Sequence, residues 1–184
     1  MSPVLLQTAE PVEIYLLPGE FHFGDSNTRI RTVLGSCVSI AAWHPLLRIG
    51  GMSHSMLPSR GKPGGHNLDG HYADEAIELL LREIGKRNTR PDEYQVKLFG
   101  GGNMLRQPLA ERAFNVAVSN IEAARLLLAS CGFKIHSEHV GGSGHRSIIF
   151  DLCDGSVMVK HESIMASLNG SPQTQAGQKN NINL

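Results

Sequence analysis

The sequence has too few cysteines for a disulfide-stabilised or cysteine-based zinc protein. Its three cysteines, Cys37, Cys131 and Cys153, are an odd number and form no CxxC pair. Neither a disulfide framework nor a zinc site is expected from that pattern. The longest apolar stretch near the N-terminus is only Val4-Leu5-Leu6, with no basic region before it, which argues against a signal peptide. We therefore expect a reduced, cytoplasmic protein.

The chain also lacks an excess of either charge and any long hydrophobic run. Seventeen Lys and Arg residues balance seventeen Asp and Glu residues, whereas nucleic acids and anionic membranes attract basic surfaces. No apolar stretch approaches the roughly 20 residues that a membrane span requires. The sequence thus predicts no nucleic-acid partner and no membrane insertion, and a monomer is expected.

The sequence does contain enough apolar residues, 41% of 184, to form one globular domain. Helical spacing of apolar residues predicts helices over 72–86 and 115–131. Strand-like patterns occupy 30–43 (interrupted at Gly35 and Ser36), 48–57, 94–99, 133–140, 146–151 and 156–161. This order predicts an α/β (α+β) sandwich with a mixed β-sheet core and two main helices. We expect the domain to span 1–168 and the polar tail, 169–184, to be disordered.

Cys37 follows Gly35 and Ser36 where the strand pattern is interrupted. Glycine allows a sharp turn there, and such a turn leaves backbone N–H groups free to stabilise an oxyanion. Cys37 is therefore a candidate nucleophile. The alternative is a small buried side chain in a strand, which is the common role of a free cysteine.

His54 lies in a strand-like segment between Met52 and Met56. Alternate residues of a strand share a face, so its imidazole would have apolar neighbours and would need a polar partner. One interpretation pairs His54 with Cys37, because a neighbouring imidazole is the usual means of activating a thiol. The other is a core histidine whose partner is backbone.

The remaining motifs are less specific. His54, His66 and His71 have no spacing typical of a metal site, so no metal is expected. The segments 100–102 and 141–144 are glycine-rich but lack a phosphate-binding signature. We interpret both as tight backbone passages that could wall a site.

Several of these motifs occur together, in order, in one known family. The chain resembles the CheD family of chemoreceptor glutamine deamidases over roughly residues 13–160. The matching motifs are Leu34-Gly35-Ser36-Cys37-Val38, Gly51-Met52-Ser53-His54-Ser55-Met56-Leu57-Pro58, Tyr72-Ala73-Asp74, Lys97-Leu98-Phe99-Gly100-Gly101-Gly102-Asn103-Met104, Asn115-Val116 and Gly141-Gly142 through Arg146-Ser147.

The resemblance implies a fold like the deamidase domain of cytotoxic necrotising factors and a Cys-His-Thr site. It places the nucleophile at Cys37, the base at His54 and the third residue at Thr32, the one nearby threonine before the cysteine. Backbone around Gly35 and Ser36 would form the oxyanion site. An ion pair with His54 is expected to lower the pKa of the Cys37 thiol.

The activity implied is protein-glutamine glutaminase: hydrolysis of receptor glutamine side chains to glutamate through a thioester, without metal or organic cofactor. The implied partners are chemoreceptor cytoplasmic domains and a CheC-type phosphatase. Two alternatives stay open at this point. One is a non-catalytic module that binds such a phosphatase, and the other is a different cysteine hydrolase, such as a receptor methylesterase.

Overall fold

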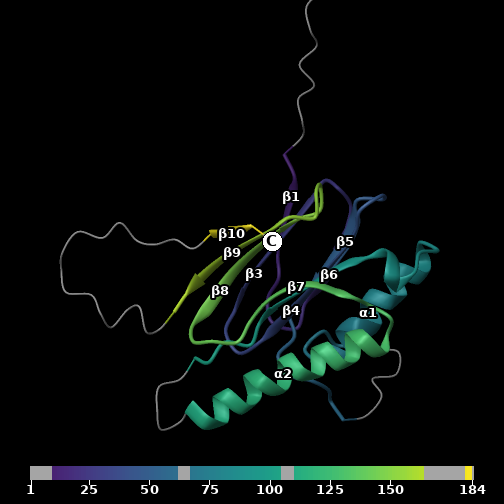
Figure 1. Cartoon of the computed structure of the whole chain (residues 1–184). Coiled ribbons are helices and arrows are strands. Elements are labelled where there is room, and N and C mark those ends of the chain that lie inside the picture. The colour runs from purple at the N-terminus through teal and green to yellow at the C-terminus, as the bar shows by residue number, and fades with distance from the viewer. Residues whose placement is uncertain (1–9, 62–66, 105–109, 164–180, 184) are drawn as a thin grey trace, which may run out of the picture.

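The computed structural model describes residues 10–61, 67–104, 110–163 and 181–183 (Figure 1). Over these residues the chain forms two five-stranded sheets and two α-helices. The first, here called the β3 sheet, has the order β1-β3-β8-β9-β10. Its strands are β1 (Val12–Tyr15), β3 (Thr28–Leu34), β8 (His145–Asp151), β9 (Val157–Glu162) and β10 (Asn181–Asn183).

The second, here called the β4 sheet, has the order β2-β5-β4-β6-β7. Its strands are β2 (Phe21–Gly24), β5 (Ile49–Ser53), β4 (Val38–His44), β6 (Gln95–Gly100) and β7 (Ile135–Val140). The pairs β1–β3 and β6–β7 are parallel and the other described pairs are antiparallel, so both sheets are mixed. The helices are α1 (Ala73–Lys86) and α2 (Ala110–Ser130), with a 3₁₀ turn, η1, at Pro91–Glu93.

The β4 sheet is the middle layer of the molecule. Figure 1 shows both helices against one of its faces, while the β3 sheet lies on the other side. Residues 38–42 of β4 are consequently all buried, because each face of that strand meets another layer. Strand β3 instead alternates, with its even-numbered residues from Thr28 to Leu34 buried against the β4 sheet.

These layers enclose two separate cores. The helix-side core lies between the β4 sheet and the helices, and includes Ile40, Leu98, Ile77, Leu80 and Leu128. The inter-sheet core lies between the two sheets, and includes Ile30, Leu34, Ala41, Met52, Phe99 and Phe150. The α/β sandwich with a mixed sheet and two helices is thus confirmed.

The segment predicted as one interrupted strand is two strands in different sheets. β3 ends at Leu34 in one sheet and β4 begins at Val38 in the other, so the turn at 35–37 carries the chain across the sandwich. The second helix begins at Ala110, five residues before the predicted start, because 110–114 is composed largely of good helix formers without an apolar stripe.

The predicted disordered tail, 169–184, falls mostly outside the described residues. Its described part, Asn181–Asn183, is strand β10, which pairs antiparallel with β9. For the rest of the tail, disorder stays a prediction. The exposed edge of β9 offers unpaired backbone N–H and C=O groups, and another strand can pair with them whatever its side chains are. The polar composition of the tail therefore did not predict a strand there.

Candidate active site

The turn at 35–37 is held through its carbonyl groups. The carbonyl oxygen of Gly35 accepts a hydrogen bond from the Gly102 N–H at 2.7 Å, and that of Cys37 accepts one from the Gly101 N–H at 2.7 Å. The Ser36 carbonyl accepts one from the Asn120 side chain at 3.1 Å. The N–H groups of these turn residues donate to no other described residue. The turn is thus fixed while its donors remain available to a bound acceptor.

Glycine is required where the segment 100–102 passes beneath this turn. Gly100 has a φ of +105°, and a Cβ there would lie 2.1 Å from the Cys37 carbonyl oxygen. A Cβ on Gly102 would lie 2.2 Å from the Gly144 carbonyl oxygen. Backbone bonds between Asn103 and the glycines at 142 and 144 join the two glycine-rich segments. The prediction that these glycine-rich segments are tight backbone passages is confirmed.

His54 directly follows β5 and is fixed at both backbone groups. Its N–H donates to the Glu20 carbonyl at 2.9 Å, and its carbonyl accepts from the Gly19 N–H at 2.8 Å. The side chain is 3% exposed. The loop between β1 and β2 therefore sets the position of the imidazole from one side.

Thr32 contacts His54 across the inter-sheet layer. The Thr32 Oγ1 lies 2.8 Å from the His54 Nδ1 and 2.9 Å from the Leu16 carbonyl oxygen. A hydroxyl has one hydrogen, and the Leu16 carbonyl can only accept it. The His54 Nδ1 must therefore carry a hydrogen and donate to Thr32, which leaves the lone pair on Nε2.

Strand register places Cys37 on the same side of the β4 sheet as His54. The pairs Ala41–Met52 and Val38–Ser55 set this register, in which Ser39 lies opposite His54 and Cys37 is one diagonal step away. Cys37 packs against the inter-sheet core, the layer from which Thr32 reaches His54. Thr32 and His54 are thus in contact, and Cys37 lies on their side of the sheet.

No hydrogen bond joins Cys37 to His54 among the described residues, and burial keeps both uncharged. Burial raises the pKa of the Cys37 thiol, although the backbone N–H of Cys37 acts in the opposite direction. Burial and then the charge of His71 lower the pKa of His54, whereas the Leu16 carbonyl and Glu20 oppose this. The direction for the resting site is opposite to the lowering that an ion pair would give, because burial disfavours the charged thiolate.

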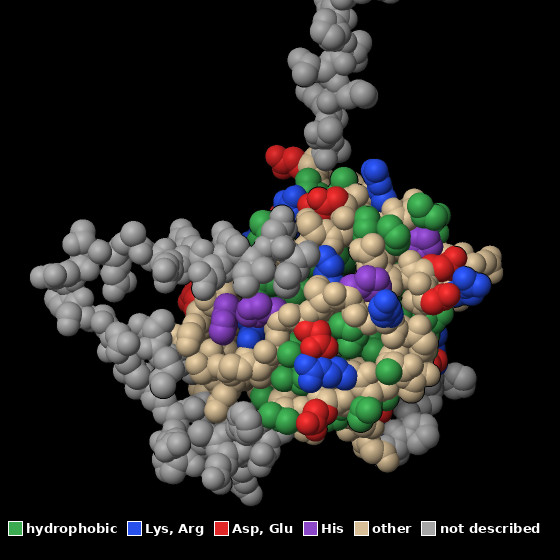
Figure 2. Space-filling view, viewed as in Figure 1, with side chains coloured by type: hydrophobic (Ala, Val, Ile, Leu, Met, Phe, Trp, Pro, Cys, Tyr) green, Lys and Arg blue, Asp and Glu red, His purple; other side chains and the backbone are tan. Residues whose placement is uncertain are grey.

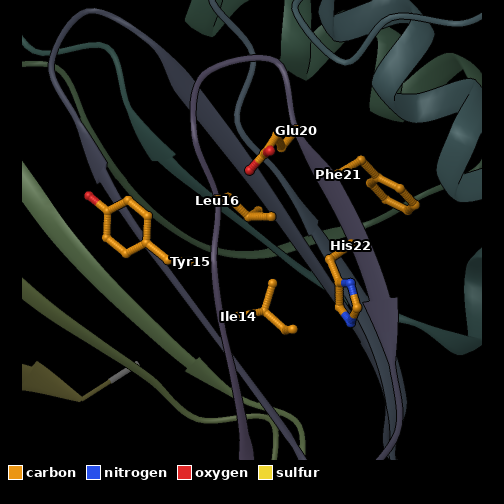
Figure 3. Close-up of a pocket in the computed structure, with 6 residues that line it drawn as sticks. All are labelled: Ile14, Tyr15, Leu16, Glu20, Phe21 and His22. Carbon is orange, nitrogen blue, oxygen red and sulfur yellow. The ribbon is translucent and has the colours of Figure 1, made fainter.

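A pocket of about 400 Å³ opens next to the histidine side of the site. Figure 3 shows Ile14 and Leu16 along the β1 side of this pocket and His22 on the β2 side, with Glu20 near the turn that joins the two strands. It lies between β1 and β2, the edge strands of the two sheets. The backbones of Leu16 and Glu20 that line it are also those that hold Thr32 and His54.

The remaining candidates lie elsewhere or outside the described residues. Cys131 packs against the helix-side core and Cys153 is exposed. His66 is not among the described residues, and those residues contain no group of three His, Cys, Asp or Glu that could hold a metal ion. Charges of both signs are interspersed on the face seen in Figure 2. No described helix is long and apolar enough to cross a membrane.

Asn120 is a residue of the site that sequence reasoning missed. It lies in α2 and is fully buried, with its side-chain Nδ2 bonded to the carbonyls of Ser36 and Met56. The available signal was an asparagine within the apolar stripe formed by Ala117, Ile121 and Ala124. A buried amide on such a stripe needs partners, and here both belong to the site.

The fold and the site together define a two-sheet α+β protein with a cysteine, histidine and threonine gathered on one side of its middle sheet. Comparison with known sequences identifies the family. Residues 56–161 match the family model described as CheD chemotactic sensory transduction. That span begins after Thr32, Cys37 and His54.

Relatives named probable chemoreceptor glutamine deamidase CheD match most of the chain. A protein of Dechloromonas aromatica is 52% identical over 79% of this chain and 85% of its own. One from Pseudomonas syringae pv. syringae is 51% identical over 84% and 87%, and one from Chromobacterium violaceum is 44% identical over 91% and 87%. The chain belongs to the CheD family.

Proposed function

We propose that this protein is a cytoplasmic, monomeric chemoreceptor glutamine deamidase with Cys37 as its nucleophile, His54 as its base and Thr32 as the residue that orients the base. The names of its relatives support the activity. The observation that carries the site assignment is the hydrogen-bond chain from His54 Nδ1 through Thr32 to the Leu16 carbonyl. That chain leaves the basic Nε2 as the ring nitrogen that can accept a proton.

In the first step, His54 Nε2 accepts the Cys37 proton as the sulfur attacks the carboxamide carbon of a glutamine side chain. Starting from a neutral thiol and a neutral imidazole suits this general-base route. The tetrahedral oxyanion forms beside the N–H groups of Gly35, Ser36 and Cys37, which donate to no other described residue. The held carbonyls keep those donors in place.

In the second step, the imidazolium returns its proton to the departing nitrogen, which leaves as ammonia, and a glutamyl thioester remains on Cys37. The neutral His54 then takes a proton from water, whose oxygen attacks the thioester carbon. Collapse of that intermediate releases glutamate and the thiol. Thr32 holds the ring in one tautomer throughout, because its hydroxyl accepts from Nδ1–H and donates to Leu16.

The test is incubation of the protein with the cytoplasmic domain of a chemoreceptor from the same cell, followed by intact and peptide mass spectrometry. Each deamidated glutamine adds about one dalton and releases one ammonia. Cys37→Ala serves as the inactive control. Cleaved receptor would indicate a peptidase, and a loss of about 14 daltons from methylated receptor would indicate a methylesterase. An unmodified receptor that still binds would favour a regulatory module, for which a CheC-type phosphatase is the partner proposed from the family resemblance.

A further inference from the structure

Asn120 joins the two segments that carry Cys37 and His54. Its Nδ2 donates to the Ser36 carbonyl at 3.1 Å and to the Met56 carbonyl at 2.9 Å. Ser36 immediately precedes Cys37, and Met56 lies two residues after His54. One amide nitrogen has two hydrogens, so both of its bonds are committed to this site.

This bridge lies just beyond the last backbone rung between the two segments. Val38 and Ser55 exchange hydrogen bonds of 2.9 and 2.8 Å, and there the pairing of the two segments ends. The next N–H along, that of Met56, donates to His71 instead. No other described donor reaches the carbonyls of Ser36 or Met56. Asn120 therefore takes the place of a backbone rung at the point where the two segments separate.

We propose that Asn120 is a positioning residue that fixes the separation of the thiol and the imidazole. This rests on the proposed Cys37–His54 pair. Their side chains are not hydrogen bonded in the resting site, so proton transfer depends on how closely their backbones hold them. A misplacement of about 1 Å can cost about 100-fold in rate. Nothing else described on α2 bonds to either segment.

A purely structural role would give a different pattern of effects. The Oδ1 of Asn120 is buried without a partner among the described residues, which is unfavourable for stability. Its neighbours Ala117, Ile121 and Ala124 are apolar, so leucine, which branches at Cγ as asparagine does, offers them an apolar side chain. Asn120→Leu removes the bonds while keeping the position filled, and Asn120→Ala removes both the bonds and the side-chain volume. The control is Leu128→Ala, a core change two turns along the same helix.

The first measurement is deamidation kinetics of folded Asn120→Leu and Asn120→Ala, with thermal midpoints for each. We expect kcat to fall about 100-fold with KM changed by less than about threefold. Leu128→Ala should lower the thermal midpoint at least as much and leave kcat near wild type. Wild-type kcat in Asn120→Leu, or an equal loss in Leu128→Ala, would overturn the proposal.

The second measurement needs no receptor and separates this inference from the proposed function. Alkylation of Cys37 by iodoacetamide near neutral pH is followed in a background with Cys131→Ser and Cys153→Ser. The four proteins are this background, His54→Ala, Asn120→Leu and the double variant. We expect His54→Ala to slow alkylation about tenfold relative to the background protein. We expect the double variant to react at nearly the same rate as Asn120→Leu. An undiminished effect of His54→Ala would overturn the positioning role alone. No effect in either background would overturn the Cys37–His54 pair and the positioning role with it.

Discussion

The two halves of the site are held in opposite ways. On the histidine half, side chains are bonded to one another: His54 to Thr32, and Thr32 to the Leu16 carbonyl. On the cysteine half, the backbone is held, and the thiol is hydrogen bonded to no other described residue. The tautomer and the orientation of the His54 ring are therefore fixed, whereas at Cys37 only the position of the backbone is fixed. This difference suits a residue that must form and break a covalent bond in every cycle.

The largest expected effect comes from removing the nucleophile. Cys37→Ala should abolish deamidation, and Cys37→Ser should do so as well, because a serine hydroxyl beside an imidazole of lowered pKa is a much weaker nucleophile. The fold should persist, since only small side-chain volume is lost at a half-buried position. Mass spectrometry of receptor substrate gives the activity, and circular dichroism gives the fold.

Cys131→Ser and Cys153→Ser are the matched controls for Cys37. The first lies against the helix-side core and the second is exposed. Both should keep wild-type activity, apart from some loss of stability in Cys131→Ser. Residual deamidation by purified Cys37→Ala would remove the nucleophile assignment.

The next largest effect concerns the base. His54→Ala should lower kcat by about 10²–10⁴-fold, the usual contribution of a positioned general base. His44→Ala is the matched control, because His44 is also a buried histidine but lies at the far end of β4. It should cost stability without a comparable loss of kcat in the folded protein. If both variants lose activity only in proportion to unfolding, His54 is a core histidine rather than a base.

A smaller effect is expected for Thr32, which contacts the ring but not the reacting atoms. Thr32→Val keeps the shape and removes the hydroxyl, so the buried Nδ1–H loses its acceptor. A hydrogen bond worth about 1–1.5 kcal/mol corresponds to roughly a tenfold loss of kcat. Thr32→Ser should recover most of it, because serine offers the same donor and acceptor. Equal activity of the valine and serine variants would contradict the orienting role.

Much of the fold could be predicted from periodicity alone. α1, with apolar residues at helical spacing, and β6, with alternating residues, were placed within one residue of their observed bounds. The division into two sheets could not be predicted, because β3 and β4 both have strand-like sequences and only long-range pairing assigns them to different layers. The first turn of α2 and the strand β10 could not be predicted either, because neither segment has an apolar pattern in its sequence.

Candidate residues for the site could be named from the sequence, but their charge state could not. Cys37 and His54 were suggested by their local sequence and by the resemblance to the CheD family, and Thr32 by that resemblance alone. Strand register places Cys37 and His54 on one face of the sheet. Burial cannot be read from those motifs, and burial sets the protonation of the thiol and the imidazole. Asn120 was missed because its partners are backbone carbonyls, which have no sequence signature.

The smallest expected effect, and the most direct test of the comparison between the two halves, is a shift in pH profile. Because burial raises the thiol pKa, alkylation of Cys37 by iodoacetamide should reach half its maximal rate above pH about 8.5, the ordinary thiol value. Because burial lowers the His54 pKa, the acid limb of kcat/KM should fall below pH about 6.5. Between these limits both groups are neutral and the rate should be level.

The same shifts fix the sign of the pH dependence of stability. Below pH about 6.5 the unfolded chain binds a proton at His54 that the folded chain resists, so acidification should destabilise the fold. Above pH about 8.5 the folded chain retains the Cys37 proton that the unfolded chain loses, so alkali should also destabilise it. His54→Ala should reduce the first dependence and Cys37→Ala the second, as measured by urea unfolding across pH. An alkylation midpoint well below 8.5 that returns to the ordinary range in His54→Ala would instead show a resting thiolate–imidazolium pair. The Cys37 sulfur would then be positioned by its ion pair with His54, as the His54 ring is positioned by its hydrogen bond to Thr32.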